Sequence, residues 1–189
     1  MLVLGIDPGT LHLGWGVVER DGNRLRHVAH GVLNMPQGRS LSGRLLDISA
    51  GLAQVIEAQK PSVASVESLF FHKDAQSAAK LGHARGVVLL CLEQAGVKLA
   101  EYAPARVKRT VVGHGRADKK QVAAMVRAML GLPKAPPSDA ADALALAITH
   151  LRLGALITSL PQRADSQAGG PETPRERLLR LVQGGRRRR

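Results

Sequence analysis

Two carboxylates in the first half of the sequence each stand at the end of an apolar, strand-like run. Asp7 follows residues 1–6 and precedes Pro8, a context that also suits an ordinary turn. Glu67 follows residues 63–66 and also suits an edge charge that reaches solvent. Ligand sites in mixed α/β folds open at strand ends. Both side chains are therefore candidates for a functional site.

Two further carboxylates lie three residues apart near the start of a later helical stretch. Asp139 follows Pro137-Ser138, where either Ser138 or Asp139 would serve as the N-cap, so capping alone could explain it. Asp142 lies in the alanine-rich run 140–148, whose small side chains predict close packing against another element. A lone carboxylate buried there is costly unless it is paired, hydrogen-bonded or metal-bound. The spacing places both carboxylates on one helix face.

The four carboxylates would repel one another if the fold brought them together without a counterion. Mg²⁺, or alternatively Mn²⁺, takes oxygen ligands, and two ions about 3.5–4 Å apart can clamp the attacking and leaving oxygens of a phosphodiester. The pattern therefore predicts a nuclease with two Mg²⁺ ions per site, in which one ion activates water and the other stabilises the departing 3′ oxygen. The sequence has no Gly-x-Ser-x-Gly elbow, Walker loop or His-Glu-x-x-His motif, which argues against competing catalytic classes.

The net charge points to a polyanionic partner. Lys and Arg number 27 against 15 Asp and Glu, which gives a formal charge of +12. Residues 104–134 carry eight basic residues against the single acidic residue Asp118, and this cluster suits either a phosphate-backbone footprint or a solvated face. We expect DNA contacts from its basic side chains, namely Lys108, Arg109, Arg116, Lys119 and Lys120.

Composition sets the domain plan. Residues 1–161 suit one nuclease domain, whereas the basic tail 162–189 is predicted to be disordered and serves either as a solubilising extension or as a phosphate tether.

The single cysteine, Cys91, excludes a disulfide framework or a thiolate zinc cluster and is predicted to be a buried thiol. Without a long apolar span or a signal-peptide pattern, we expect a cytoplasmic protein that does not contact membranes.

Periodicity predicts the elements that must position these residues. An antiparallel three-strand start is followed by alternating helices and strands, which predicts a mixed α/β sheet covered by helices. The expected strands are residues 1–6, 13–19, a third ending near 33, 62–67 and 97–102, and the expected helices are residues 40–59, 74–96, 104–112, 118–130 and 138–157.

Five blocks, in order, carry a resemblance to a known family. They are GIDPGT (residues 5–10), VESLF (66–70), KLGHARGV (80–87), VKRTVVG (107–113) and DAADALA (139–145). Together they resemble the bacterial RuvC family of Holliday-junction resolvases over residues 1–155. The first block alone would also suit the phosphate loop of the actin and sugar-kinase superfamily, but that fold needs a second lobe for which this chain is too short.

The resemblance implies a ribonuclease-H-like fold with a mixed five-stranded sheet, and a homodimer that makes paired, symmetrical nicks in a four-way DNA junction. A twofold enzyme matches a twofold substrate. It further implies a role in DNA recombination and repair, a nucleoid-associated bacterial location, and a branch-migration motor of the RuvA and RuvB type as partner. The helix 74–96 is our hypothesis for the dimer surface.

The resemblance also assigns roles residue by residue. Asp7, Glu67, Asp139 and Asp142 fall on the family's metal-binding positions, although some relatives carry His where this chain has Asp139. Lys108 and Lys119 fall on basic positions needed for activity, and Phe70 on an aromatic position that handles bases at the junction. Phe71 has no such match and is predicted to pack in the core, which is also the alternative for Phe70.

Two other functions remain open at this point. One is a ribonuclease-H-like nuclease that acts on RNA–DNA hybrids, and the other is a nonenzymatic DNA architectural protein. Asp142 argues against the architectural role, because a pure DNA binder gains nothing from acids inside its basic surface.

Overall fold

The computed structural model describes residues 1–68 and 75–157, in which five strands form one sheet in the order β3-β2-β1-β4-β5. β1 pairs antiparallel with β2 and parallel with β4, β2 and β3 form an antiparallel hairpin, and β5 extends the sheet parallel to β4. The strands are β1 (Leu2–Asp7), β2 (His12–Asp21), β3 (Arg24–Asn34), β4 (Val63–Glu67) and β5 (Lys98–Tyr102). The mixed five-stranded sheet is the one expected.

The helices confirm the predicted order and differ from the predicted bounds by a residue or two. They are α1 (Leu41–Gln59), α2 (Ala75–Gln94), α3 (Pro104–Val112), α4 (Lys119–Leu130) and α5 (Ser138–Ile157). The side chain of Ser40 accepts a hydrogen bond from the amide of Gly43 and caps α1. Asp118 forms a capping box with Gln121 at the start of α4. The capping interpretation of Asp139 was wrong, because this residue lies inside the first turn of α5.

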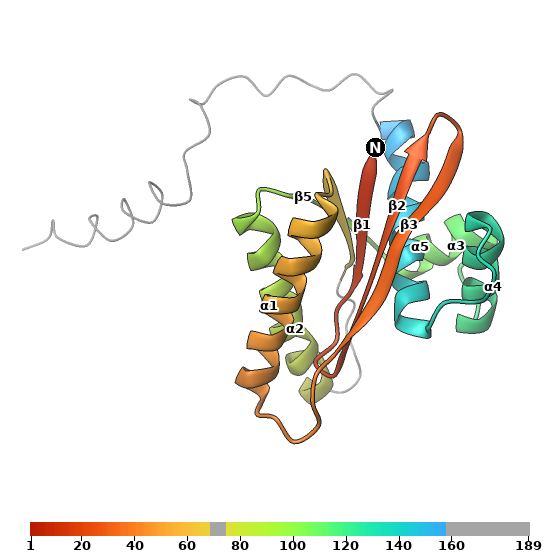
Figure 1. The fold of residues 1–189 in the computed structure, drawn as a ribbon. Helices are drawn as coiled ribbons and strands as arrows, with labels where there is room; N and C mark the ends of the chain where they lie inside the picture. The colour runs from red at the N-terminus through yellow and green to blue at the C-terminus, as the bar shows by residue number, and fades with distance from the viewer. Residues whose placement is uncertain (69–74, 158–189) are drawn as a thin grey trace, which may run out of the picture. The chain divides into compact units, whose positions relative to one another are not determined.

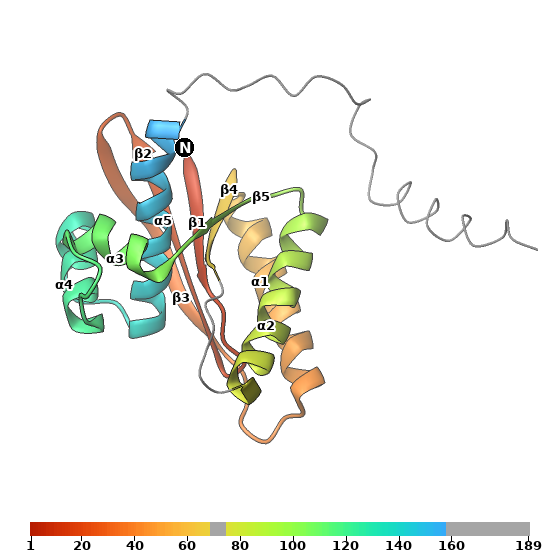
Figure 2. The same ribbon diagram turned by 180° about the vertical axis from the view of Figure 1, so that it is seen from behind.

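Alternation along the strands divides the sheet into two faces. In β1, Leu4 and Ile6 face the layer formed by α1 and α2, whereas Val3 and Gly5 face α5. Asp7 has the same parity as Val3 and Gly5, so it lies on the α5 face. Figures 1 and 2 show α1 and α2 on one side of the sheet and α3, α4 and α5 on the other.

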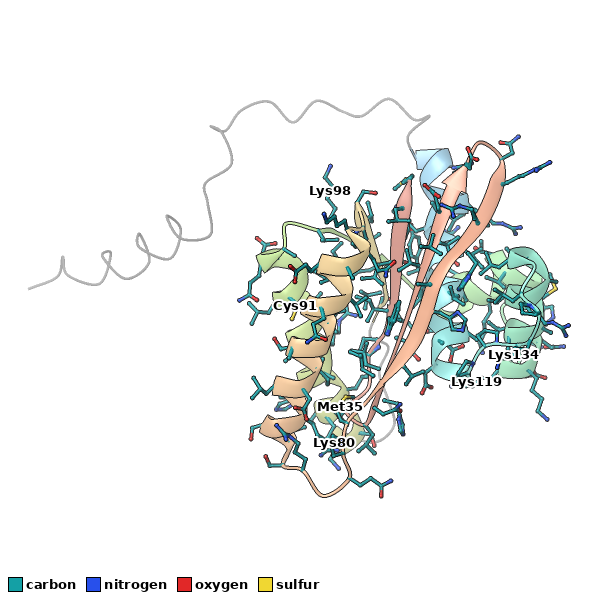
Figure 3. All side chains as sticks on the ribbon, in the orientation of Figure 1. Met35, Lys80, Cys91, Lys98, Lys119 and Lys134 are labelled. Carbon is teal, nitrogen blue, oxygen red and sulfur yellow. The ribbon has the colours of Figure 1, made fainter. Side chains whose placement is uncertain are left out.

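The face toward α1 and α2 is a conventional aliphatic core. Ile48 and Leu52 of α1 and Val88 and Leu92 of α2 are buried against the sheet. Cys91 is buried in the same layer, as predicted, and Figure 3 shows it on α2. This layer stabilises the sheet through the burial of large apolar side chains.

The face toward α5 carries glycines and permits an unusually close approach of two backbones. A Cβ on Gly5 would lie 1.8 Å from the carbonyl oxygen of Ala143, and one on Gly14 would lie 2.0 Å from that of Asp139. Both distances are far below van der Waals contact, so only glycine fits beneath the helix at these positions. Five alanines of α5 are also buried, namely Ala140, Ala141, Ala143, Ala145 and Ala147. α5 therefore lies directly on β1 and β2.

Several predictions concern residues that the structure does not describe. Phe70 and Phe71 fall within residues 69–74, and the predicted tail 162–189 falls within residues 158–189, and both ranges lie outside the described residues. Among the helices of the described residues, none is long and apolar enough to cross a membrane.

Candidate active site

The sheet itself places two of the predicted carboxylates side by side. β1 and β4 are parallel neighbours, and Ile6 of one strand is in register with Val66 of the other. Asp7 and Glu67 are the next residues and the last of their strands. Their side chains therefore leave the same edge of the sheet on the same face.

α5 supplies the other two carboxylates. The close contact of Asp139 with Gly14 sets the first turn of the helix against β2, beside the end of β1. The hydroxyl of Ser65 donates a hydrogen bond of 3.0 Å to the carbonyl oxygen of Leu146 and ties the helix to β4. Asp142 is half-buried between the fully buried neighbours Ala141 and Ala143, so its carboxylate is less enclosed than the alanine-rich sequence suggested.

A pocket of about 250 Å³ opens where these elements meet. Three of the predicted carboxylates line it, Asp7, Glu67 and Asp142, whereas Asp139 lies outside the lining. The predicted basic residues Lys108 and Lys119 also line it. Its apolar walls are Pro104, Val107, Val122 and Leu146. The pocket therefore combines acids from three elements with ammonium groups from α3 and α4.

The electrostatics of the pocket are dominated by Asp7. Burial, together with repulsion by Asp142, Glu67 and Asp139, raises the pKa of this carboxyl to about 7, although Lys119 acts in the opposite direction. The other three predicted carboxylates therefore lie within electrostatic range of Asp7. Crowded acids of this kind are stabilised by a cation.

Lys119 supplies one such positive charge. Its Nζ lies 3.2 Å from Oδ2 of Asp142, with the two side chains 71% and 28% exposed. Attraction to Asp142 is the main reason that the pKa of Lys119 is raised above its usual value, with smaller contributions from Asp7 and Asp139. Figure 3 shows Lys119 on the helical layer that contains α5.

The donor chemistry of the pocket suits a hard divalent cation. Within residues 1–68 and 75–157, no three His, Cys, Asp or Glu side chains already form a metal-binding group. Carboxylate oxygens are nonetheless the ligands that Mg²⁺ and Mn²⁺ prefer, and the pKa of Asp7 is raised by burial and by repulsion from neighbouring acids, which such an ion would relieve. Asp7, Glu67 and Asp142 are the residues in the pocket able to hold it.

The remaining predicted basic residues lie on elements that contribute to the pocket. Arg109 on α3, Arg116 before α4 and Lys120 on α4 are exposed and do not line the pocket. They lie on the same two helices as Lys108 and Lys119, or in the connection between these helices. They add positive charge to this part of the surface.

Sequence reasoning missed one charged residue next to the site. Arg85 of α2 is 7% exposed, and its guanidinium donates a hydrogen bond to the main-chain oxygen of Glu67 and forms an ion pair with Glu101. The residue lies in the block KLGHARGV, which served only as a sequence match. A charged residue within an otherwise helical, partly apolar segment is the signal that could have identified it.

Comparison with known proteins decides the family. The profile of the family described as Crossover junction endodeoxyribonuclease RuvC matches residues 3–150. The chain belongs to the RuvC family. A curated relative with that same description, from Sorangium cellulosum (strain So ce56), is 54% identical over 181 residues, covering 96% of this chain and 99% of the relative.

Solved structures agree with this assignment. The structure described as T. thermophilus RuvC in complex with Holliday junction substrate matches with a TM-score of 0.78 and 41% identity, over 84% of this chain and 97% of that one. The yeast mitochondrial Holliday junction resolvase Ydc2 has a TM-score of 0.61 at 14% identity, over 82% of this chain and 81% of that one, so its likeness concerns the fold alone. The predicted family, the ribonuclease-H-like fold and the enzyme class, crossover junction endodeoxyribonuclease, are confirmed.

Proposed function

We propose that this chain resolves four-way DNA junctions in recombination and repair, by paired symmetrical nicks made through metal-dependent phosphodiester hydrolysis. The observation that carries the proposal is the pocket in which Asp7, Glu67 and Asp142 meet Lys108 and Lys119. A RuvC-family enzyme needs a site that tolerates both a divalent ion and a phosphate, and this pocket offers ligands for each.

The acidic residues of the pocket are the proposed metal ligands. Asp7, Glu67 and Asp142, with Asp139 close by, hold two Mg²⁺ ions per active site, and Mn²⁺ can substitute. Bound there, the ions supply an activated water and charge stabilisation at the leaving 3′ oxygen. A partner charge for Asp142 is already present in Lys119.

The basic residues of the pocket and its surroundings are the proposed DNA-binding residues. Lys108 and Lys119 contact the scissile phosphate or its neighbour, because both line the pocket. Arg109, Arg116 and Lys120 bind the adjacent backbone from the exposed surfaces of α3 and α4. Phe70, which follows Glu67 by three residues, stacks on a base beside the cut.

The assembly and its surroundings complete the proposal. A homodimer with two such sites matches the symmetry of a four-way junction, and a branch-migration motor of the RuvA and RuvB type delivers the substrate. The division into a nuclease domain (1–161) and a basic tail (162–189), and action at the bacterial nucleoid in the cytoplasm, belong to the same proposal.

The decisive experiment compares cleavage of a labelled four-way junction, a linear duplex and an RNA–DNA hybrid, each with Mg²⁺, Mn²⁺ or EDTA. Wild type is expected to nick only the junction, at paired sites, and only with metal. Asp7→Asn is expected to lower cleavage by at least about 1,000-fold while junction binding stays equal or tightens, because a ligand and a repulsive charge are removed together.

The control variant makes the same substitution of Asp by Asn at a position away from the pocket. Asp21→Asn at the exposed end of β2 is expected to cleave at the wild-type rate. Tight junction binding without cutting under any metal would refute the nuclease proposal and favour an architectural role. Cleavage of the hybrid at the rate of the junction would refute the proposed substrate.

A further inference from the structure

Arg85 is the buried charged side chain of the described residues, and it lies against the strand end that carries Glu67. Its side chain is 9% exposed, and burial lowers the pKa of its guanidinium whereas the charge of Glu67 raises it. A buried charge is costly to desolvate, and apolar side chains of similar volume stabilise such places at least as well. Stability alone therefore does not account for an arginine here.

The contacts of Arg85 are aimed at two strand ends. Nη1 donates a hydrogen bond of 2.5 Å to the main-chain oxygen of Glu67, the last residue of β4. Nη2 forms an ion pair with the carboxylate of Glu101 on β5. Because Glu101 is in register with Val66, the guanidinium joins the ends of neighbouring parallel strands.

The position of this bridge matters for the pocket. Arg85 lies on α2, which packs on the face of the sheet opposite α5, and its guanidinium reaches the main-chain oxygen of Glu67 from that face. The rigid guanidinium fork fixes both acceptors at once. The main chain of Glu67 is thereby held while its side chain lines the pocket on the other face.

We infer that Arg85 is a positioning residue for Glu67, which fixes the end of β4 so that this carboxylate is presented to a divalent ion in the pocket. The inference rests on the proposed function, in which Glu67 is a metal ligand. Arg85 itself does not line the pocket. Groups that orient ligands in this way typically change metal affinity or activity by about 10–100-fold when they are removed.

The test compares Arg85→Met with Val88→Ala in the full-length chain. Val88 is buried on the same helix, less than one turn after Arg85, and belongs to the aliphatic core. Val88→Ala is expected to lower stability, so thermal unfolding establishes a temperature at which wild type and both variants are folded. The readouts are Mn²⁺ binding to the protein alone by electron paramagnetic resonance, single-turnover junction cleavage against Mn²⁺ and Mg²⁺ concentration, and junction binding in EDTA.

Arg85→Met is expected to raise the half-saturating Mn²⁺ concentration by about 10-fold or more in both metal readouts, with junction binding in EDTA unchanged. Val88→Ala is expected to leave the metal concentrations within 2-fold of wild type, by the same order-of-magnitude criterion. Equal metal dependence in the two variants would overturn the inference, since a purely structural role would affect both alike.

Arg85→Lys decides the question if the methionine variant does not fold. Lysine keeps the charge but cannot reproduce the planar fork, so an increase of about 3-fold in half-saturating Mn²⁺ is expected. If Arg85→Met does not fold and Arg85→Lys has the same metal dependence as wild type, the inference is overturned. A wild type that binds no Mn²⁺ and cuts no junction overturns the proposed function together with the inference, whereas an active wild type matched by the Arg85 variants overturns the inference alone.

Discussion

On one face of the sheet, α1 and α2 pack through large aliphatic side chains such as Ile48 and Leu52, whereas on the other face α5 lies directly on Gly5 and Gly14. In Figure 3, Met35 and Cys91 lie on the side of α1 and α2, and Lys119 lies on the side of α5. The difference lies in how far each helix stands from the strands. Side chains keep packed helices about 8–10 Å from their neighbours, and glycine removes that spacer.

This difference teaches how stability and positioning are divided. The aliphatic face buries apolar area, which stabilises the fold but tolerates small shifts. The glycine face brings the first turn of α5 against β2, so the carboxylates of the helix are placed by backbone contact with the sheet that carries Asp7. Catalytic geometry is sensitive to displacements of about 1 Å, which the glycine face prevents.

Among the substitutions that test this comparison, Gly14→Ala is expected to have the largest effect on cleavage. The new Cβ would lie 2.0 Å from the carbonyl oxygen of Asp139, so the start of α5 must move away from β2. Junction cleavage is expected to fall by about 100-fold or more, since displaced carboxylates no longer meet in the pocket. Single-turnover cleavage, with circular dichroism to establish folding, measures the effect.

The control for that substitution is Gly154→Ala on the same helix. The three atoms nearest to a Cβ there belong to the ring of His150, at 3.5–3.8 Å, and the position lies far along α5 from the carboxylates. Full activity is expected with stability unchanged or slightly increased. Full activity in Gly14→Ala as well would show that close backbone contact does not set the site.

The opposite face is tested by Leu52→Ala. Leu52 is fully buried in α1, so its truncation is expected to lower the free energy of unfolding by about 2–5 kcal/mol. Cleavage well below the melting temperature is expected to stay within 2-fold of wild type, a margin of about 0.4 kcal/mol. Urea denaturation and single-turnover cleavage separate the two quantities, and a large loss of activity in the folded variant would contradict the division between the faces.

The raised pKa of Asp7, on the glycine face, predicts that the stability of the fold depends on pH. The pKa of Asp7 is raised to about 7 in the folded protein, so the folded state holds a proton that the unfolded state releases near pH 4. The stability due to Asp7 is therefore fully present below about pH 4 and is lost as the pH rises to about 7.

Asp7→Asn removes this loss. In EDTA at pH 8 the variant is expected to be more stable than wild type by about 4 kcal/mol at most, since the pKa is raised from 3.8 to about 7 and each pKa unit corresponds to about 1.4 kcal/mol, and by little at pH 4. Thermal unfolding at the two pH values measures the difference. A gain of the same size at both pH values would show that Asp7 is not the titrating group.

The smallest effect is expected from Lys119→Ala, which removes an exposed partner of Asp142. Because Lys119 lowers the pKa of Asp7, its loss moves this pKa further above 7, and single-turnover cleavage is expected to fall by about 10-fold near neutral pH. Lys98→Ala on β5, outside the pocket, serves as the charge-matched control and is expected to cleave normally. Equal rates for the two variants would remove Lys119 from the site.

Much of the site's framework could be predicted from local sequence. The run ending at Asp7, the run ending at Glu67 and the three-residue spacing of Asp139 and Asp142 all reflect periodicities of strand and helix, which depend on neighbouring residues. The cap of Asp139 was predicted wrongly because element ends depend on one or two residues of backbone geometry.

The contacts of the site could not be predicted in the same way. Two contacts join residues that are well separated along the chain. They are the ion pair between Lys119 and Asp142 and the hydrogen bond from Arg85 to the main-chain oxygen of Glu67. Asp142 was expected to be enclosed by its alanines, yet its side chain is 28% exposed because it lies at the open edge of the α5 contact. No periodicity encodes which exposed lysine meets which acid.

The sequence by itself determined the element order, the approximate bounds of the strands and helices, and the resemblance that placed the chain in its family. Only the tertiary structure decided that β4 pairs with β1 rather than with its sequence neighbour β3, and that α5 rests on the glycines of β1 and β2. The physical reason is that periodicity is a property of a few consecutive residues, whereas strand pairing and helix docking follow from burying the whole chain's apolar surface at once.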